Sequence, residues 1–302
     1  MFVKVLVTGA SGLLGHKIVK ELMSGDYDII AIYNKSRPVV EGGNVRWVQL
    51  DLVNTHLVED LILKERPDVV VHAAAYTDVD GCEVNREYAW RVNVEATRSI
   101  VRASRVVRAF LIYVSTDYVF DGEKGLYKES DVPCPVNYYG LTKLIGEQLV
   151  ITSDLLYTVV RTSAIYGVGP GKLNFATFVV DRLSKGESIF ALVDQYVSPT
   201  LNTLLAKAIA EIMELKPMGI LHVAGERMNR YDFAVRVADL FGLPKELIKE
   251  GRMKDMTHWK ARRPRDSSLD VSKARSLLKT PFYDVNLSLK LFAEEYNRLG
   301  SG

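Results

Sequence analysis

An α/β protein with a doubly wound parallel sheet and a smaller, mainly C-terminal lobe is the fold that this sequence predicts. Short β-branched runs alternate with segments of helical periodicity over the first half of the chain, which is the rhythm of βαβ units whose helices cover both faces of a sheet. A glycine-rich turn separates the first run from the first helical segment. Beyond residue 225 the alternation fades into helical segments, which indicates the smaller lobe.

The strands are expected where short apolar, β-branched runs are bounded by glycine, proline or polar turns. The run at 2–8 stops at Gly9, the run at 28–33 ends in a polar turn, and Pro67 precedes the run at 69–72. The full set of expected strands is 2–8, 28–33, 45–50, 69–72, 110–114, 157–161 and 220–224.

The helices are expected where apolar residues recur every three or four positions. In the first of them, Leu14, Ile18 and Leu22 share one face, which suits a helix packed on a sheet. The expected helices cover approximately 13–23, 55–64, 85–107, 138–150, 175–184, 201–215, 231–241, 271–278 and 287–299.

Length and composition exclude several classes of protein. With 302 residues, 48% of them hydrophobic and 25% charged, the chain is an ordinary globular protein that can bury a large core. Its net charge of +2 argues against a nucleic-acid or membrane-surface partner, and no apolar run is long enough to span a bilayer. Cys82 and Cys134 have no metal-like spacing, and the N-terminus lacks signal-peptide anatomy, so we expect a cytoplasmic protein with reduced thiols.

The turn TGASGLLG at 8–15 carries glycines at three-residue intervals between the first strand and the first helix. Glycine permits the tight turn and the close approach of a pyrophosphate, which the first-turn N–H groups and the helix dipole then face. This context predicts a Rossmann-type dinucleotide site. The cofactor-binding candidates in the turn are Gly9, Ser11, Gly12, Leu13 and Leu14.

The end of the second strand selects between nicotinamide cofactors, because an acidic residue there commonly binds the ribose hydroxyls of NAD. Here the segment 33–37 holds two cations, Lys35 and Arg37, and no acid. Either cation would match the 2′-phosphate of NADP(H), so NADP(H) is favoured and NAD(H) is the alternative. A basic turn that is merely exposed to solvent and binds no cofactor would have the same sequence. Further cofactor contacts are expected after the third and fourth strands, at Asp51, Leu52, Ala73, Ala74 and Ala75.

We expect residues 1–163 and about 201–224 to form the dinucleotide-binding domain. The smaller, substrate-binding lobe is expected from about 164–200 together with 225–302. A Gly/Pro-rich loop at 167–171 follows the first of these boundaries.

Tyr139 and Lys143 lie four positions apart in the segment that opens the helix at 138–150. On a helix both side chains point the same way, so the ammonium can stabilise the phenolate and bring the pKa of the phenol toward neutrality. A surface Tyr-Lys pair would have the same spacing. Of the two adjacent tyrosines, only Tyr139 is four residues from the lysine.

Together these segments resemble an extended short-chain dehydrogenase/reductase and, more narrowly, the dTDP-4-dehydrorhamnose reductases. Beside TGASGLLG, the matching stretches are HAAAYTDVDGCE (72–83), STDYVFDG (115–122), YYGLTKLIGE (138–147), DQYVSPT (194–200) and ARRPRDSSLD (261–270). The resemblance implies that NAD(P)H reduces a 4-keto-6-deoxy sugar nucleotide in dTDP-rhamnose biosynthesis. By position, Thr116, Tyr139 and Lys143 correspond to the catalytic hydroxyl, the proton donor and the lysine that binds the nicotinamide ribose.

The same resemblance suggests residues that contact the substrate. Asp117 and Tyr118 follow the catalytic threonine, Asn174 and Gln195 fall in segments near the nucleotide, and Arg263, beside Arg262, could pair with the diphosphate. A surface arginine pair or a packing tyrosine would look identical in sequence.

Two further positions and the question of a metal qualify the resemblance. The family usually follows RTS with Trp, but here Ala164 stands at that position, so the sugar itself is not predicted. Asn93 either supports the lysine through water or forms an interhelical hydrogen bond. Relatives use Mg²⁺ at a dimer contact, and a homodimer is compatible with the sequence, but no acidic spacing here requires a metal, so no metal site is expected.

Two other functions share this fold. One is an NADP-binding regulatory subunit similar to the β subunit of methionine adenosyltransferase, which modulates a partner enzyme. The other is a sugar-nucleotide epimerase or dehydratase; a dehydratase adds an acidic pair after the threonine, and here Asp117 is followed by Tyr118. The intact set of Thr116, Tyr139 and Lys143 favours an enzyme.

Overall fold

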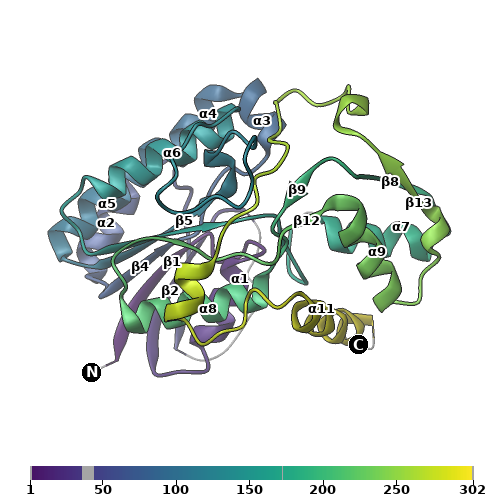
Figure 1. Cartoon of the computed structure of the whole chain (residues 1–302). Helices are drawn as coiled ribbons and strands as arrows, with labels where there is room; N and C mark the ends of the chain where they lie inside the picture. The colour runs from purple at the N-terminus through teal and green to yellow at the C-terminus, as the bar shows by residue number, and fades with distance from the viewer. Residues whose placement is uncertain (1, 36–43, 172, 301–302) are drawn as a thin grey trace.

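The computed structural model describes residues 2–35, 44–171 and 173–300 and confirms the parallel α/β architecture. Within these residues the main sheet has seven strands, all pairing in parallel (Figure 1). From edge to edge they are β11 (Gly219–His222), β6 (Tyr157–Thr162), β5 (Phe110–Thr116), β4 (Val69–His72), β1 (Val3–Thr8), β2 (Tyr27–Tyr33) and β3 (Val45–Gln49). The chain reverses direction across the sheet between β1 and β4, and ligands of such sheets bind beyond the carboxyl ends at this point.

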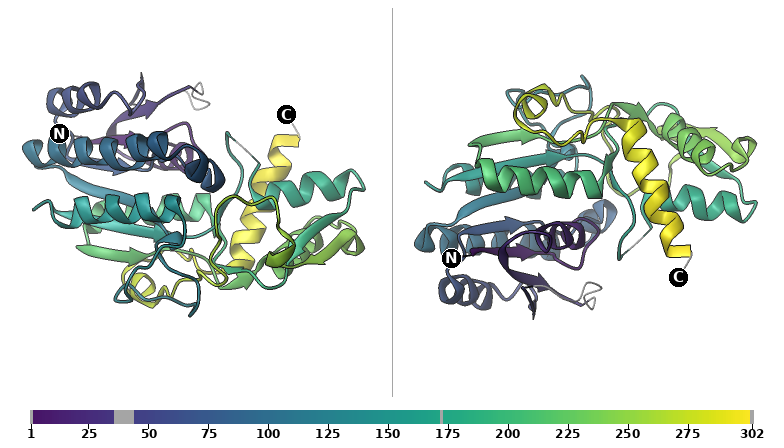
Figure 2. Two further views of the ribbon diagram at one scale, coloured as in Figure 1. Left: turned by 90° about the horizontal axis from the view of Figure 1, so that it is seen from above. Right: turned by 90° about the horizontal axis from the view of Figure 1, so that it is seen from below.

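Helices cover both faces of the sheet, as the alternation predicts (Figures 1 and 2). On one face α1 (Gly15–Leu22) packs against α8 (Asn202–Leu215), and on the other lie α2 (Thr55–Glu65), α5 (Ala96–Val107) and α6 (Tyr138–Ile151). Each face buries its own hydrophobic cluster against the strands.

The expected long helix at 85–107 is interrupted. It comprises α4 (Arg86–Trp90), a π-helical turn at Arg91–Glu95 and then α5, and a separate helix, α3 (Val79–Val84), precedes it. The π turn carries Asn93, whose buried amide bonds to the backbone of Tyr76 and to Thr142 Oγ1 on α6. A π turn adds one residue to a helical turn, and the apolar pattern of the sequence does not reveal it because the helical faces on either side remain regular.

A second group of elements lies beside the sheet (Figure 1). Its helices are α7 (Phe175–Ser184), α9 (Arg230–Leu240) and α11 (Val285–Gly300), which share a core of Tyr166, Phe233 and Phe292. Short strand pairs connect them, and the sequence did not predict these because runs of two to four residues carry no clear period. They are β7 (Ile165–Tyr166) with β10 (Thr200–Leu201), β8 (Ile189–Leu192) with β13 (Ile248–Gly251), and β9 (Tyr196–Val197) with β12 (Met228–Asn229).

The segment 256–271, here called the strap, returns from this second group to the sheet (Figures 1 and 2). Asp80 on α3 anchors it by accepting hydrogen bonds from the backbone N–H groups of Lys260 and Ala261, both at 2.9 Å. The strap leads into α10 (Ser272–Leu277), which packs against β11 at the sheet edge. Two regions distant in sequence therefore close one side of the sheet.

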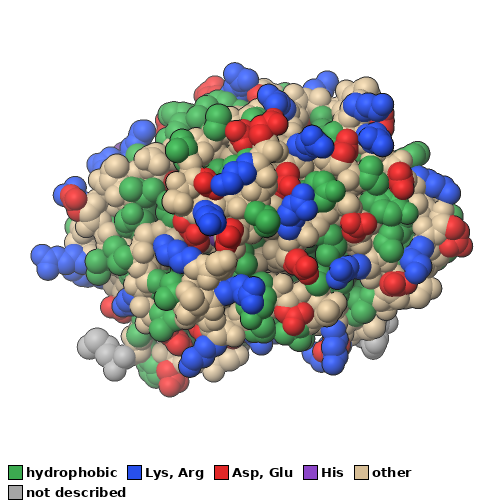
Figure 3. Space-filling model, in the orientation of Figure 1, with side chains coloured by type: hydrophobic (Ala, Val, Ile, Leu, Met, Phe, Trp, Pro, Cys, Tyr) green, Lys and Arg blue, Asp and Glu red, His purple; other side chains and the backbone are tan. Residues whose placement is uncertain are grey.

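On the face of the molecule that Figure 3 shows, cationic and anionic side chains are interspersed. Within the described chain, none of the helices combines the length and the apolar character that a membrane span requires.

Glycine at position 146 lets α6 lie directly on β5. A Cβ atom there would lie 2.1 Å from the hydroxyl of Tyr113, a fully buried side chain of β5. The same two elements carry the residues expected to be catalytic, so this contact sets their separation.

We predict that Gly146→Ala lowers the free energy of unfolding by about 1–3 kcal/mol through overpacking. Helix propensity alone predicts the opposite sign, because Ala is favoured over Gly by about 1 kcal/mol in a helix interior. Chemical denaturation measures the change, with Gln148→Ala, an exposed position on the same helix, as the control that stays within about 0.5 kcal/mol of wild type. A more stable Gly146→Ala protein would contradict the packing argument.

Candidate active site

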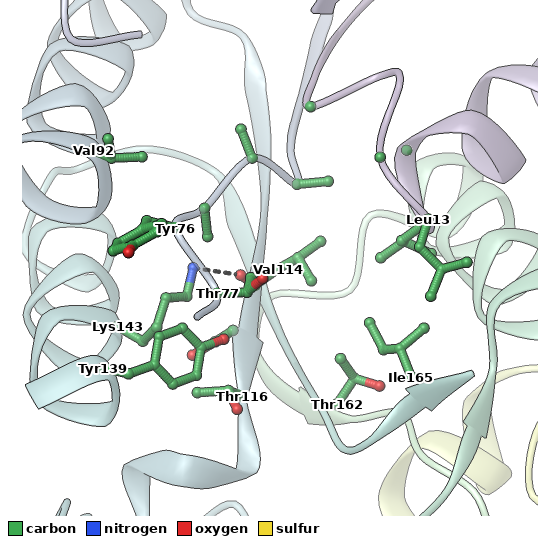
Figure 4. A pocket seen from close by; sticks show the side chains of 18 of the residues that line it. Leu13, Tyr76, Thr77, Val92, Val114, Thr116, Tyr139, Lys143, Thr162 and Ile165 are labelled. Carbon is green, nitrogen blue, oxygen red and sulfur yellow. Dashed lines mark hydrogen bonds between the residues drawn. The ribbon is translucent and has the colours of Figure 1, made fainter. Parts of the chain in front are cut away.

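A cavity of about 860 Å³ opens at the carboxyl ends of the central strands, where the chain reverses across the sheet. It brings together every predicted cofactor residue that the structure describes; Arg37 lies outside the described residues. Those lining the cavity are Gly9, Ser11, Gly12, Leu13, Leu14, Lys35, Asp51, Leu52, Ala73, Ala74 and Ala75. The catalytic candidates line the same cavity: Thr116, Tyr139 and Lys143 (Figure 4).

The glycine turn is shaped for close approach. Gly9 has φ +68°, and a Cβ there would lie 2.8 Å from the Cα of Ala74, the residue that Thr8 Oγ1 holds through its backbone N–H at 3.2 Å. The small residues after β4 are therefore required by the turn itself as well as by any ligand. Beyond the turn, α1 presents its N-terminal backbone to the cavity, which suits an anionic group.

Tyr139 and Lys143 are positioned by the start of α6. The Asn137 side chain caps the helix by accepting a hydrogen bond from the Gly140 N–H at 2.8 Å, so the helix begins at Tyr138. Both side chains then point into the cavity from one helix face (Figure 4). Lys143 Nζ donates to the carbonyl oxygen of Val114 on β5 at 2.8 Å and lies 4.0 Å from the centre of the Tyr113 ring.

Burial dominates the protonation of this pair. Burial raises the pKa of Tyr139 above its ordinary value of 10, with the Thr116 hydroxyl opposing, so the phenol keeps its proton at neutral pH. Burial lowers the pKa of Lys143 from 10.5 to about 7, with Glu147 opposing. Lys143 is not among the main influences on the Tyr139 pKa. The expected lowering of that pKa by the lysine is therefore outweighed in this structure, and the neutral phenol suits a proton donor.

Thr116 and Asp117 form a hydrogen-bonded unit at the end of β5. Thr116 Oγ1 donates to Asp117 Oδ1 at 3.0 Å and accepts from the Tyr118 N–H at 3.2 Å, so it also caps the following turn. Asp117 Oδ2 accepts from the hydroxyls of Ser163 at 2.8 Å and Ser267 at 2.5 Å. Burial raises the Asp117 pKa, and these three hydroxyls oppose it. Asp117 lines the cavity, but both of its oxygens already hold protein partners.

The other residues expected to bind substrate make contacts within the protein. The Asn174 side chain caps α7 by accepting a hydrogen bond from the Thr177 N–H, and the Thr177 hydroxyl accepts one from the Asn174 N–H in return. Arg263 pairs with Asp80 at 3.0 Å, with 11% of its side chain exposed. Gln195 is buried and accepts from Arg230 Nε at 3.4 Å. None of these three, Asn174, Arg263 or Gln195, is among the residues that line the cavity, whereas Tyr118 does line it.

Arg230 is the residue that sequence reasoning missed. It begins α9, lines the cavity, and its guanidinium lies 5.2 Å from the Phe175 ring centre. Tyr118 and Asp117 are among the groups whose charge acts on Arg230, so it lies at the same end of the cavity as Thr116. No motif marked it, because its placement depends on Gln195, which is distant in sequence.

Ala164 also lines the cavity, with an unusual backbone. Its φ of +42° lies in the left-handed region that non-glycine residues rarely adopt. Among the described residues, no group of three His, Cys, Asp or Glu side chains is arranged to hold a metal ion.

A glycine turn after strand β1 of a parallel sheet, with a tyrosine and a lysine one helical turn apart in the same cavity, defines an extended short-chain dehydrogenase/reductase, an NAD(P)-dependent oxidoreductase. Within that class the chain belongs to the family described as "RmlD substrate binding domain", whose model matches residues 3–298.

The chain is also similar to two differently named known proteins. The chain is 33% identical to methionine adenosyltransferase 2 subunit beta of Pongo abelii over 291 residues, which cover 92% of this chain and 84% of that protein. It is also 33% identical to the dTDP-4-dehydrorhamnose reductase of Aggregatibacter actinomycetemcomitans, with 95% of this chain and 97% of that protein covered.

Solved structures agree in fold. A hypothetical dTDP-4-dehydrorhamnose reductase from Sulfolobus tokodaii matches with a TM-score of 0.85 and 44% identity, covering 95% of this chain and 98% of that one. The dTDP-4-dehydrorhamnose reductase of Bacillus anthracis, solved in complex with NADP, matches with a TM-score of 0.86 and 29% identity, covering 98% of this chain and all of that one (100%).

We predict that Lys143→Met abolishes turnover while stabilising the fold. Below pH 7 the lysine is charged in both the folded and the unfolded state, and the folded state bears the full cost of burying it; this cost disappears as pH rises from about 7 to 10.5. The variant should therefore exceed wild type by at least about 1 kcal/mol near pH 6 and by progressively less toward pH 10. Denaturation curves across this range measure the difference.

The control is Lys207→Met on α8, which removes an exposed lysine. Its difference from wild type should stay small and independent of pH. A Lys143→Met protein that is less stable than wild type at pH 6 would show that contacts of the lysine outweigh the cost of burying its ammonium.

Proposed function

We propose that this protein uses NADPH to reduce the 4-keto group of a 4-keto-6-deoxy sugar nucleotide, as in the formation of dTDP-rhamnose. One observation carries the proposal: Thr116, Tyr139 and Lys143 line the same cavity as the glycine turn. The relatives named dTDP-4-dehydrorhamnose reductase support the substrate class.

The cavity fits a nicotinamide dinucleotide. The approach of Gly9 to Ala74 leaves backbone and methyl groups where a dinucleotide must pass, and α1 offers its N-terminus to the pyrophosphate. Lys35 lines the cavity after β2, where we propose that it binds the 2′-phosphate with Arg37. The NADP held by the Bacillus anthracis relative supports this preference over NAD.

We assign each catalytic side chain one task. NADPH, when bound, supplies hydride to the carbonyl carbon. Tyr139 gives the carbonyl oxygen its phenolic proton, which the raised pKa keeps in place at neutral pH. Thr116 donates a hydrogen bond to the same oxygen after turning from Asp117, and Lys143 holds the nicotinamide ribose. Reduction of the ketone to an alcohol is balanced by this one hydride and one proton.

For the rest of the substrate we propose Arg230 as the partner of the diphosphate, because its guanidinium lies in the cavity beyond Tyr118. Gln195 orients Arg230, and Asp117 orients Thr116. Arg263 and Asn174 support the site from behind, through Asp80 and the cap of α7.

A second candidate is a regulatory subunit, which the similarity to methionine adenosyltransferase 2 subunit beta favours. Such a subunit needs a cofactor site but no proton donor, whereas this chain retains a half-buried Tyr139 in the cavity with Thr116. We also propose that the protein works in the cytoplasm, which its free Cys82 and Cys134 support, and that it can form a homodimer.

Tyr139→Phe tests the catalytic assignment. With dTDP-4-dehydrorhamnose as substrate, we expect kcat to fall by about 10²–10⁴-fold, because the proton donor is lost, while the Kd for NADPH changes less than about twofold. Loss of NADPH absorbance measures turnover and fluorescence titration measures cofactor binding. The control is Tyr138→Phe, in which the Arg86 guanidinium 5.1 Å from that ring can still stack. A wild-type protein that binds NADPH, turns over no keto sugar nucleotide and co-purifies with a synthetase would favour the regulatory subunit.

Arg230→Gln tests the diphosphate assignment. We expect KM for the sugar nucleotide to rise about 10–100-fold, since a charge-assisted hydrogen bond is lost, with little change in NADPH affinity. Arg236→Gln, at an exposed position of the same helix, should leave KM at the wild-type value. Equal KM values for the two variants would exclude Arg230 from substrate binding.

A further inference from the structure

A charged pair lies buried behind the catalytic lysine. Arg161 on β6 and Glu147 on α6 join through Nη2–Oε2 at 2.7 Å and Nε–Oε1 at 2.9 Å, with side-chain exposures of 2% and 0%. Ser115 Oγ donates a third hydrogen bond to Glu147 Oε1 at 2.5 Å. Burying such a pair is costly, and well-packed apolar residues often serve stability equally well. We therefore look for a role of the Arg161–Glu147 pair other than stabilising the fold.

The pair is built into the contact that holds Lys143. Glu147 follows Lys143 by four residues, so both lie on one face of α6. Three consecutive residues of β5 meet this face: Tyr113 Oη donates to the Lys143 carbonyl at 3.4 Å, the Val114 carbonyl accepts from Lys143 Nζ, and Ser115 donates to Glu147. Strand β5 therefore holds both Lys143 and Glu147 in place.

The charges around Lys143 single out Glu147. From β4, His72 is kept neutral, because burial, and then the lysine itself, lower its pKa to about 3. Burial raises the pKa of Tyr113 on β5 and of Tyr139 on α6, so both phenols are neutral at physiological pH. Among the described residues around the lysine, Glu147 is the anion that favours its charged form, and Arg161 and Ser115 hold that carboxylate in place.

We propose that Glu147, held by Arg161 and Ser115, is a positioning residue that keeps the side chain of Lys143 as an ammonium ion in the active site. This inference rests on the proposed function, in which a charged Lys143 binds the ribose. Burial opposes the charge, and one carboxylate a helical turn away compensates for part of that cost. Glu147 favours the charged form of Lys143, whereas Arg161 is not among the main influences on the Lys143 pKa, so removing both members of the pair still removes net support from the lysine.

The test is the double variant Glu147→Gln with Arg161→Gln, which removes both charges of the pair together. Titration of Lys143 is followed by trace acetylation with acetic anhydride across pH, quantified at Lys143 by mass spectrometry. We expect the midpoint to shift toward acid by about one pH unit or more, and the alkaline limb of kcat/KM to move in the same direction. An unchanged midpoint would overturn the proposal and leave the pair a purely structural role.

A matched control removes another partly buried pair. Lys17 and Glu295, 2.7 Å apart, join α1 to α11 away from Lys143, so Lys17→Met with Glu295→Gln should lower stability without moving the Lys143 midpoint. Glu147→Asp keeps a carboxylate and should retain most of the wild-type midpoint. A shift in the control as large as in the test variant would count against a specific effect.

Two safeguards keep the outcomes separable. If the glutamine double variant does not fold, Glu147→Met with Arg161→Met gives the same readout, since apolar replacement of a buried pair is often tolerated. Labelling needs no substrate, so a failure of the proposed reductase activity would appear as absent turnover in wild type with the midpoint shift intact.

Discussion

The contact between α6 and β5 is the constraint on which this active site depends. Thr116 ends β5, while Tyr139 and Lys143 belong to the first turns of α6, so the relative placement of two elements sets the distances among three side chains. Gly146 lets the helix reach the Tyr113 hydroxyl, and the Val114 carbonyl receives the lysine. These contacts are rigid because they lie in the core, where a displacement would also break the Glu147–Arg161 pair.

The site trades stability for chemistry. A lysine, a carboxylate and a guanidinium are buried together, and each costs free energy that an apolar core would not. Asp117 adds a fourth buried group, which accepts hydrogen bonds from the hydroxyls of Thr116, Ser163 and Ser267. The Ala164 backbone, with φ +42°, adds strain at the same cavity. The large apolar clusters on both faces of the sheet must offset these costs.

The sequence predicted those features of the fold and the site that depend on residues close together in the chain. Strand and helix periodicity, the glycine turn and the Tyr139–Lys143 spacing depend on residues near one another in the chain, and the structure places them together. Arg230 and the partnership of Arg263 with Asp80 depend on contacts between residues far apart, so no spacing reveals them. The π turn at Asn93 and the two-residue strands were not predicted for a different reason, since each is too short to produce a recognisable period in the sequence.

The hydrogen bond from Ser267 to Asp117 spans 150 residues and has a consequence for how the protein is made. Because synthesis begins at the N-terminus, strands β1 to β6 leave the ribosome long before the strap that carries Ser267. Until the strap arrives, Asp117 lacks one of its three hydroxyl partners and β11 lacks the α10 helix that covers it. Asp117 therefore reaches its full set of hydroxyl partners only once residue 267 has left the ribosome, late in the synthesis of the chain.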